Sequence, residues 1–187
     1  MQKYLAPSFI APLIILLMGE VTPAIAARVS VTVAPYFSSH MVIQRDQLVP
    51  VWGTAAAGTE MTVSFQEQTV SAFADSNGKW RVELEPMPAS GTPGSMIVRG
   101  GGRQITFTDV LVGDVWVLSG QSNINVRLQD CDDGPQAVRD SVHYPNLRLY
   151  LIPQTGSPTE QWEVSNPTNT PDWSGVGFFF AQELFDY

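Results

Sequence analysis

The sequence predicts an antiparallel β-sandwich followed by the beginning of an α/β domain. Between residues 27 and 108, short stretches of alternating apolar and polar residues are separated by turn residues, as in strands with one buried face. After Asp109 the apolar runs become nearly continuous, which is typical of a strand covered on both faces, and a segment with helical spacing follows. We therefore expect the sandwich at 27–108 and the N-terminal part of the α/β domain at 109–187.

The first 26 residues have the layout of a secretory signal peptide. Lys3 gives a basic start, Phe9 to Met18 is an apolar run, and Ala24-Ile25-Ala26 is a small-x-small exit. A membrane anchor is the alternative, but the apolar run is shorter than the roughly 20 residues that span a bilayer. We expect cleavage near Ala26 and export to the periplasm or the extracellular space.

The strands of the sandwich follow from alternation and turn residues. They are expected at Val29–Val33, Val49–Gly53, Met61–Phe65, Val70–Phe73, Trp80–Leu84, Met96–Val98 and Ile105–Phe107. Asp75-Ser76-Asn77-Gly78-Lys79 is expected as a hairpin turn, because Asn-Gly tolerates positive φ. Gly100-Gly101-Gly102 is expected as a second reversal.

The second domain shows a strand, turn, strand and helix, the order in which an α/β domain begins. Strands are expected at Val110–Val112, Val115–Leu118 and Leu147–Ile152, a loop at Pro153–Pro171, and a helix after Ser174. A domain that starts at Asp109 is short for a doubly wound sheet, which needs roughly 100 residues or more. We expect the chain to be the N-terminal portion of a longer protein, with apolar surface at Val115–Leu118 and Phe178–Phe180 partly exposed.

Charge and cysteine content exclude several classes of partner. The formal net charge is -8 and there is no Lys/Arg cluster, which argues against nucleic acids and anionic membranes. Cys131 is the only cysteine, so no disulfide forms within the chain. The acidic Asp130–Gly134 stretch lacks the spacing of a calcium loop and is expected to be a solvated acidic loop.

A polar turn, Ser119 to Asn123, follows the apolar run Val115–Leu118. A serine at a helix start just after a strand is exposed to a substrate, and nearby backbone N–H groups can hold an oxyanion. Ser122 fits this position, with Gly120 permitting a tight turn. Ile124 stands where a G-x-S-x-G elbow needs its second glycine. From these residues alone, an ordinary turn is the stronger interpretation.

Several segments together resemble a known family. L-S-G-Q-S-N resembles the nucleophile block of the SGNH/GDSL hydrolases, in the form found in sialate O-acetylesterases and related carbohydrate acetylesterases. The segments that carry the resemblance are Ser38–Asp46, Val49–Gly53, Asp109–Asn123 and Trp173–Leu184. They occur in the family's order and spacing, and the resemblance as a whole extends over nearly all of the chain after residue 26.

The resemblance implies a β-sandwich with an SGNH (flavodoxin-like) α/β domain, in an exported esterase that removes O-acetyl groups from sialic acids or related sugars. Ser122 would be the nucleophile and an oxyanion donor, Gly120 and Gln121 would shape the turn, and Asn123 would support it. No metal or organic cofactor is needed. Ile124 and Asn125 replace the family's Met and acidic residue.

The resemblance also implies an Asp-x-x-His segment that supplies the base, and this would lie beyond Tyr187. We therefore expect the 187-residue chain to be inactive alone. A local base, His143 with Asp140, is a second option because triads are defined by geometry, although a histidine beside Tyr-Pro in a loop is more often a surface residue. His40 is expected to pack or to form a hydrogen bond within the sandwich.

The tryptophans divide into two groups. Trp52, Trp80 and Trp116 lie in strand patterns and are expected in the core, whereas Trp162 and Trp173 are the candidates for substrate contact. Two other functions stay open, a non-catalytic sandwich module that binds sugar or protein and an acetylxylan esterase. The sequence does not fix the oligomeric state.

Overall fold

The computed structural model describes residues 30–152 and 161–185. The expected signal peptide at 1–26 and part of the expected loop at 153–171 lie outside these residues. The strands are β1 (Thr32–Val33), β2 (Val42–Gln44), β3 (Val49–Thr54), β4 (Glu60–Phe65), β5 (Gln68–Phe73), β6 (Lys79–Leu84), β7 (Ser90–Gly100), β8 (Arg103–Gly113), β9 (Arg148–Tyr150) and β10 (Trp162–Val164). The α-helices are α1 (Gly134–Asp140) and α2 (Gly175–Phe185), and the 3₁₀ turns are η1 (Ser122–Asn125), η2 (Leu128–Asp130), η3 (Ser141–His143) and η4 (Thr170–Asp172).

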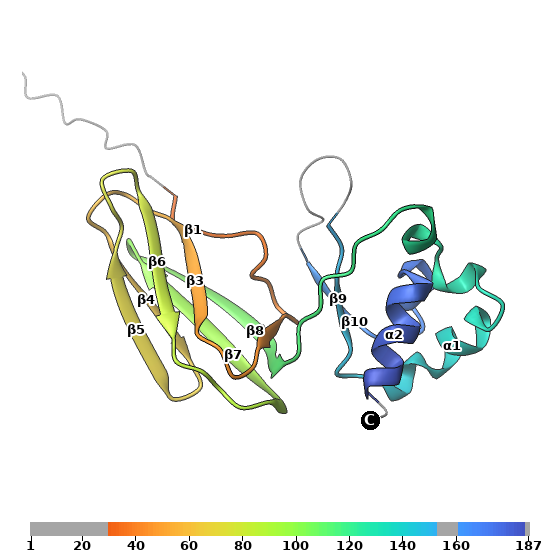
Figure 1. Ribbon diagram of the computed structural model, residues 1–187. Coiled ribbons are helices and arrows are strands. Elements are labelled where there is room, and N and C mark those ends of the chain that lie inside the picture. Colours follow the sequence, from red (N-terminus) through yellow and green to blue (C-terminus); the bar gives the residue numbers. More distant parts are fainter. Residues whose placement is uncertain (1–29, 153–160, 186–187) are drawn as a thin grey trace, which may run out of the picture.

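The first part of the chain forms two sheets that share one core (Figure 1). A three-stranded sheet has the order β1-β3-β6, and a five-stranded sheet has the order β2-β8-β7-β4-β5. Alternate side chains of β4 and β6 point into the core: Met61, Val63, Phe65, Trp80, Val82 and Leu84. This confirms the alternation predicted for these two strands. Burial of one such side chain contributes about 1.5–3 kcal/mol.

The prediction of purely antiparallel sheets is wrong at one pair. β2 runs parallel to β8, with Val42 opposite Leu111 and Gln44 opposite Gly113. Strands β3 to β7 lie between these two strands in the sequence. A long connection of this kind permits parallel pairing, which a tight hairpin does not. The parallel pair places the segment after residue 38 beside the end of β8.

The turn at Asp75–Lys79 does not close a hairpin, contrary to the prediction. β5 pairs with β4 and β6 pairs with β3, so the turn carries the chain from one sheet to the other. The turn itself is well formed, because Asp75 Oδ1 accepts hydrogen bonds from the backbone N–H groups of Asn77 and Lys79, at 2.8 and 2.9 Å. Local turn chemistry therefore identified the reversal but not the strand partners. The reversal at Gly100–Gly102 does join the paired strands β7 and β8, as predicted.

β8 passes through the expected domain boundary at residues 108/109. It continues to Gly113 and buries Val110 and Val112 in the same core as the other strands. The strand expected at Val115–Leu118 is wrong, because these residues have no regular secondary structure. Val117 is 88% exposed, since no strand among the described residues pairs with this segment.

The second part of the chain has a smaller core made by Leu128, Ala137, Trp173 and Phe178. The α/β arrangement expected here is not confirmed, because β9 and β10 form an antiparallel pair. The helix predicted after Ser174 is confirmed as α2, and Ser174 Oγ accepts a hydrogen bond from the Gly177 N–H at 3.2 Å. Partial exposure is confirmed for Val115–Leu118 and Phe180, but Phe178 is buried.

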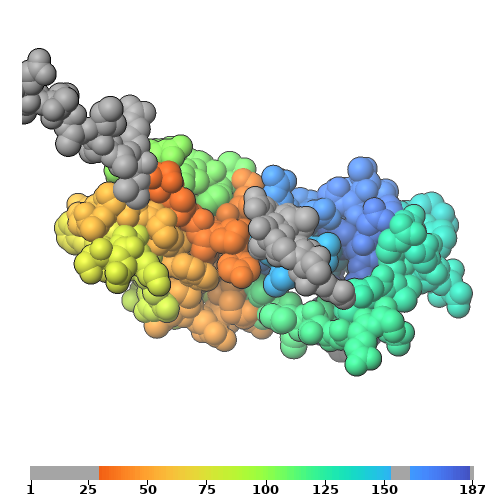
Figure 2. Space-filling view, turned by 90° about the horizontal axis from the view of Figure 1, so that it is seen from above, coloured from red at the N-terminus to blue at the C-terminus, as the bar shows by residue number. Residues whose placement is uncertain are grey.

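The two parts meet at the hairpin β9–β10, which lies between the large sheets and α2 (Figure 1). Trp162 Nε1 donates to Tyr36 O at 2.9 Å, and the Tyr150 hydroxyl donates to Pro35 O at 3.1 Å. The space-filling view shows the parts packed end to end in one elongated molecule (Figure 2). In the described ranges, no helix has the length and apolar character needed to cross a bilayer.

Candidate active site

Ser122 opens the 3₁₀ turn η1, immediately after the irregular segment 114–120. Gln121 is the residue before the first turn, with φ −110° and ψ −141°, and both Gln121 and Ser122 are exposed. The Ser122 hydroxyl makes no hydrogen bond with the residues that the structure describes. The side chain is therefore free to meet both a base and a substrate.

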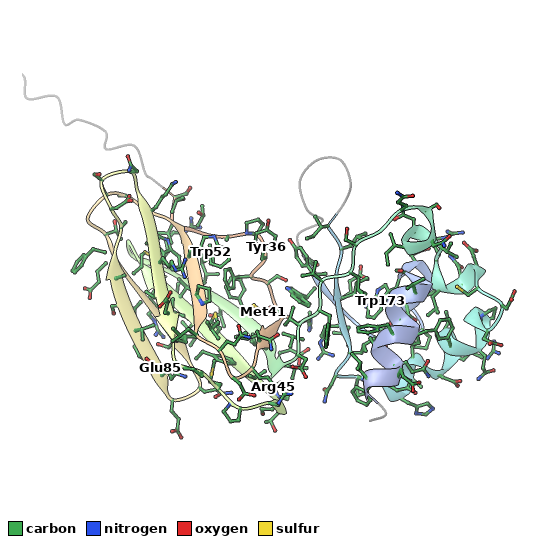
Figure 3. All side chains as sticks on the ribbon, viewed as in Figure 1. Tyr36, Met41, Arg45, Trp52, Glu85 and Trp173 are labelled. Carbon is green, nitrogen blue, oxygen red and sulfur yellow. The ribbon has the colours of Figure 1, made fainter. Side chains whose placement is uncertain are left out.

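Backbone hydrogen bonds tie the Ser122 turn to the start of α2. The Ile124 N–H donates to Gln121 O at 3.2 Å and closes the turn. Just beyond it, the Gly175 N–H donates to Val126 O at 2.8 Å, and the Leu128 N–H donates to Trp173 O at 2.7 Å. Trp173 is itself fixed in the second core (Figure 3). The position of Ser122 thus depends on the first turn of α2.

The segment before Ser122 runs along α2. The Trp116 and Phe180 rings meet edge to face with centroids 5.5 Å apart. A Cβ added at Gly177 would lie 3.1 Å from Leu118 Cδ1, so the absence of a side chain lets this segment approach the helix. At Gly120 an added Cβ would lie 3.4 Å from Ile124 Cβ, which is ordinary contact. Gly120 is therefore not required by crowding within the chain.

The histidines lie away from hydrogen-bonding contact with Ser122 in the part of the chain that is described. His143 is exposed in η3, and the neighbouring Asp140 carboxylate accepts hydrogen bonds from Gln136 Nε2 at 2.8 and 2.9 Å. His40 Nδ1 lies 2.6 Å from Asp109 Oδ2 at the junction of the two parts. The predicted site residues Gly120–Asn123 therefore lie in one turn, and neither histidine forms a hydrogen bond with Ser122 in the described part of the chain.

Asp109 is shared with a second partner, Arg148 of β9. Arg148 Nη2 donates to Asp109 at 3.1 and 3.3 Å, Nη1 donates to Pro145 O, and the Arg148 side chain is 3% exposed. Burial lowers the pKa of Arg148, against the charge of Asp109, which raises it. His40 belongs to this polar junction, which agrees with the hydrogen-bonding alternative of its predicted role and not with packing alone.

Arg127, which was not among the predicted site residues, joins two of the short turns that follow Ser122 in the chain. Its guanidinium donates to Asp130 Oδ2 at 2.8 Å and to Asp172 Oδ1 at 3.3 Å, joining η2 to η4. The hydrogen bond and charge of Asp130 raise the pKa of Arg127, which favours its charged form. The Arg-x-x-Asp spacing was a visible signal for the first pair only. Among the described residues, no group of three acidic, His or Cys side chains is placed to hold a metal ion.

The tryptophans differ from their predicted roles. Trp80 is buried as expected, but Trp52 is 38% and Trp116 is 62% exposed. Trp52 occupies an outward position of β3 next to buried Val51, and Trp116 lies in the irregular segment. Trp173, a candidate for substrate contact, is 3% exposed and donates to Glu163 Oε2 at 2.6 Å. It is a structural residue.

Comparison with known proteins identifies similar chains. No family model matches the sequence. A sialate O-acetylesterase from Pongo abelii is 25% identical over 91% of this chain and 38% of its own length, and one from Mus musculus is 26% identical over 97% and 38%. A crystal structure of a carbohydrate acetylesterase from Xanthomonas citri superposes with a TM-score of 0.77 and 33% identity, covering 83% of this chain and 37% of that one.

The chain spans less than two fifths of the length of each of these proteins. The match nevertheless covers most of the described fold, with its three sheets and few helices. The chain is thus related to the sialate O-acetylesterases and to a carbohydrate acetylesterase, as the resemblance in its sequence predicted, and it resembles these hydrolases over a little more than a third of their length.

Proposed function

We propose that this chain carries the nucleophile of an exported serine esterase that removes O-acetyl groups from sialic acids or related acetylated sugars. The observation that carries the proposal is the placement of Ser122 at the start of η1, exposed and without a hydrogen bond to any described residue. The similarity of the chain to proteins named as acetylesterases supports the reaction type. Export rests on the layout of the first 26 residues.

The reaction would be an acyl transfer in two steps. Ser122 Oγ attacks the acetyl carbonyl carbon and loses its proton to a base, and the sugar alcohol leaves with a proton. Water then attacks the acetyl-serine ester, releasing acetate and restoring the hydroxyl. The Ser122 N–H would hold the oxyanion in both steps, with Gly120 and Gln121 shaping the turn and Asn123 supporting it. None of these steps requires a metal or an organic cofactor.

We further propose that the two sheets are a β-sandwich domain, at 27–108, and that 109–187 is the N-terminal part of an SGNH hydrolase domain. The shared core of the two sheets supports the first assignment. The second is supported by the separate core around Trp173 and by the contact between η1 and α2, which places a serine turn beside a helix start. β8 reaches into both ranges.

The general base has two proposed sources. His143 is one, and it would have to move toward Ser122, because in the described residues it forms no bond with that side chain. An Asp-x-x-His segment of the kind that the resemblance implies is the other. A serine without its base loses most of its rate acceleration, so the two sources predict different activities for the 187-residue chain.

The test is acetate release from O-acetylated sialic acid and from an acetylated neutral sugar, without and with imidazole as an external base. Ser122→Ala is compared with Ser119→Ala, a neighbouring exposed serine in the same turn. We expect Ser122→Ala to abolish release, by about a thousandfold or more where the parent is active, and Ser119→Ala to retain it. His143→Ala shows whether release without imidazole uses the local histidine. Absence of Ser122-dependent release under both conditions overturns the proposal for this chain.

A further inference from the structure

A row of aromatic side chains crosses the junction between the two parts of the molecule. Tyr36 lies 6.4 Å from Trp52 of β3 and 5.9 Å from Tyr150 of β9, measured between ring centroids. Tyr150 in turn lies 5.5 Å from Trp162 of β10. The row draws on rings from both parts of the molecule, so it belongs to neither part alone. Figure 3 labels Tyr36 and Trp52 on the side of the sheets that faces the hairpin.

A shallow groove of about 230 Å³ adjoins one end of this row. The residues that line it include Tyr36, Phe37, Gln44, Leu48, Trp52 and Val115. No charged residue lines the groove, although the chain as a whole carries a formal net charge of -8. A buried charge on a ligand would find no partner here, and an unpaired charge is costly to desolvate. The groove therefore suits an uncharged ligand.

Tyr36 and Trp52 present both apolar rings and unused polar atoms. They are 46% and 38% exposed. Within the described residues, the Tyr36 hydroxyl and the Trp52 indole N–H make no hydrogen bond. The indoles that serve the fold differ, because Trp80, Trp162 and Trp173 each donate to an oxygen atom. Tyr and Trp with one apolar and one wet end are typical of binding surfaces.

We propose that Tyr36, Trp52 and the adjoining groove bind an uncharged saccharide, outside the Ser122 turn. A sugar ring has an apolar C–H face, which fits a tilted aromatic surface, and hydroxyl groups at its edge, which fit free O–H and N–H groups. The ligand class rests on the proposed function, since an esterase of acetylated sugars meets the same saccharide beyond the ester. The site favours neutral sugars over sialic acid, because the groove itself has no cation to pair a carboxylate and Arg81, opposite Trp52 in β6, is already paired with Glu83.

The test measures binding without turnover. The chain with Ser122→Ala is titrated with xylotetraose, an uncharged and unacetylated oligosaccharide, and with 3′-sialyllactose as the anionic probe. Binding is followed through the indole N–H signals of the five tryptophans in ¹H–¹⁵N spectra, with the Trp52 signal assigned by its loss in Trp52→Phe. We expect xylotetraose to shift the Trp52 signal and leave that of buried Trp80 in place, and we expect sialyllactose to bind more weakly.

Three further variants in the same background locate the site. Trp52→Ala and Tyr36→Ala should each weaken xylotetraose binding about tenfold or more, and Tyr36→Phe tests the hydroxyl without removing the ring. Phe73→Ala is the matched control, since Phe73 of β5 is 68% exposed and does not line the groove. It should bind within about twofold of the parent. Thermal unfolding shows whether each variant is folded.

Three outcomes overturn the inference. The first is xylotetraose binding that a folded Trp52→Ala variant leaves unchanged, and the second is an absence of binding to the parent. The third is sedimentation showing a dimer that Trp52→Ala dissociates, which would make a second copy of the chain the occupant of the groove. Acetate release is measured separately. Loss of release with intact xylotetraose binding contradicts the proposed function alone, and the reverse contradicts this inference alone.

Discussion

The Arg148 guanidinium lies 3.1 Å from Asp109 Oδ2 and joins the hairpin β9–β10 to β8. Only 3% of the Arg148 side chain is exposed, against 28% of Asp109. Arg148 Nε is buried and has no hydrogen-bond partner in the structure. Among the described residues, Asp109 supplies the only carboxylate paired with this buried cation, so Arg148 depends strongly on it.

Asp109→Asn should lower the free energy of unfolding by about 3 kcal/mol, the lower end of the cost of removing one partner of a buried ion pair, because it leaves the buried Arg148 cation uncompensated. Asparagine is chosen because Asp109 has a φ of +54° and asparagine tolerates this conformation. Urea unfolding at neutral pH measures the loss. Asp114→Asn is the matched control, since its partner Arg45 is exposed and such surface pairs contribute little. Equal losses in the two variants would contradict a special role for the junction.

The Asp114–Arg45 pair should instead reveal itself through pH. A hydrogen bond from Arg45 Nε, at 2.9 Å, lowers the pKa of Asp114 from its ordinary value of 3.8. A depressed carboxylate pKa contributes stability above the unfolded value, and that contribution disappears as pH falls through the folded value. The stability difference between the parent and Asp114→Asn should thus be constant near neutrality and vanish in acid. Unfolding curves at pH 6 and below pH 3.8 test this, and a difference that grew on acidification would refute it.

Gly175→Ala should destabilise the start of α2 by about 1–3 kcal/mol, as overpacking commonly does. An added Cβ would overlap Cys131 Sγ, while Leu128 Cα and Val126 O lie at an ordinary 3.6 Å. Because one sulfur atom causes the overlap, Cys131→Ala should restore most of the lost stability in the double variant. Thermal unfolding of the single and double variants forms a double-mutant cycle. Strictly additive effects would show that the crowding comes from elsewhere.

Local patterns predicted those elements whose burial is decided within a few residues. Alternation in β4 and β6 gave the correct inward faces, and Ser174 gave the start of α2. The same reasoning failed where a distant strand decides the outcome. Val115–Leu118 is apolar enough for a strand, but pairing partners are a tertiary property that composition does not contain.

The candidate site shows the same division. Ser122 was identified because a polar turn after an apolar run is visible in the sequence, and the structure does place it at a turn. The exposure of Trp52 was not visible, since it depends on which face of β3 the other sheet covers. Arg148 and Asp109 are 39 residues apart, and no motif in the residues around either one indicates that they form an ion pair.

The parallel pairing of β2 with β8 has a consequence for the order in which the protein folds. The bonds that fasten the opening segment, His40 to Asp109 and Arg45 to Asp114, each join residues 69 positions apart. During synthesis, β2 therefore has no strand to pair with until β8, its neighbour in the sheet, has left the ribosome. Contacts of such long range slow folding because a large loop must close before they form. We expect β2 to be the last strand of the two sheets to dock, and the most open to premature association with a neighbouring chain.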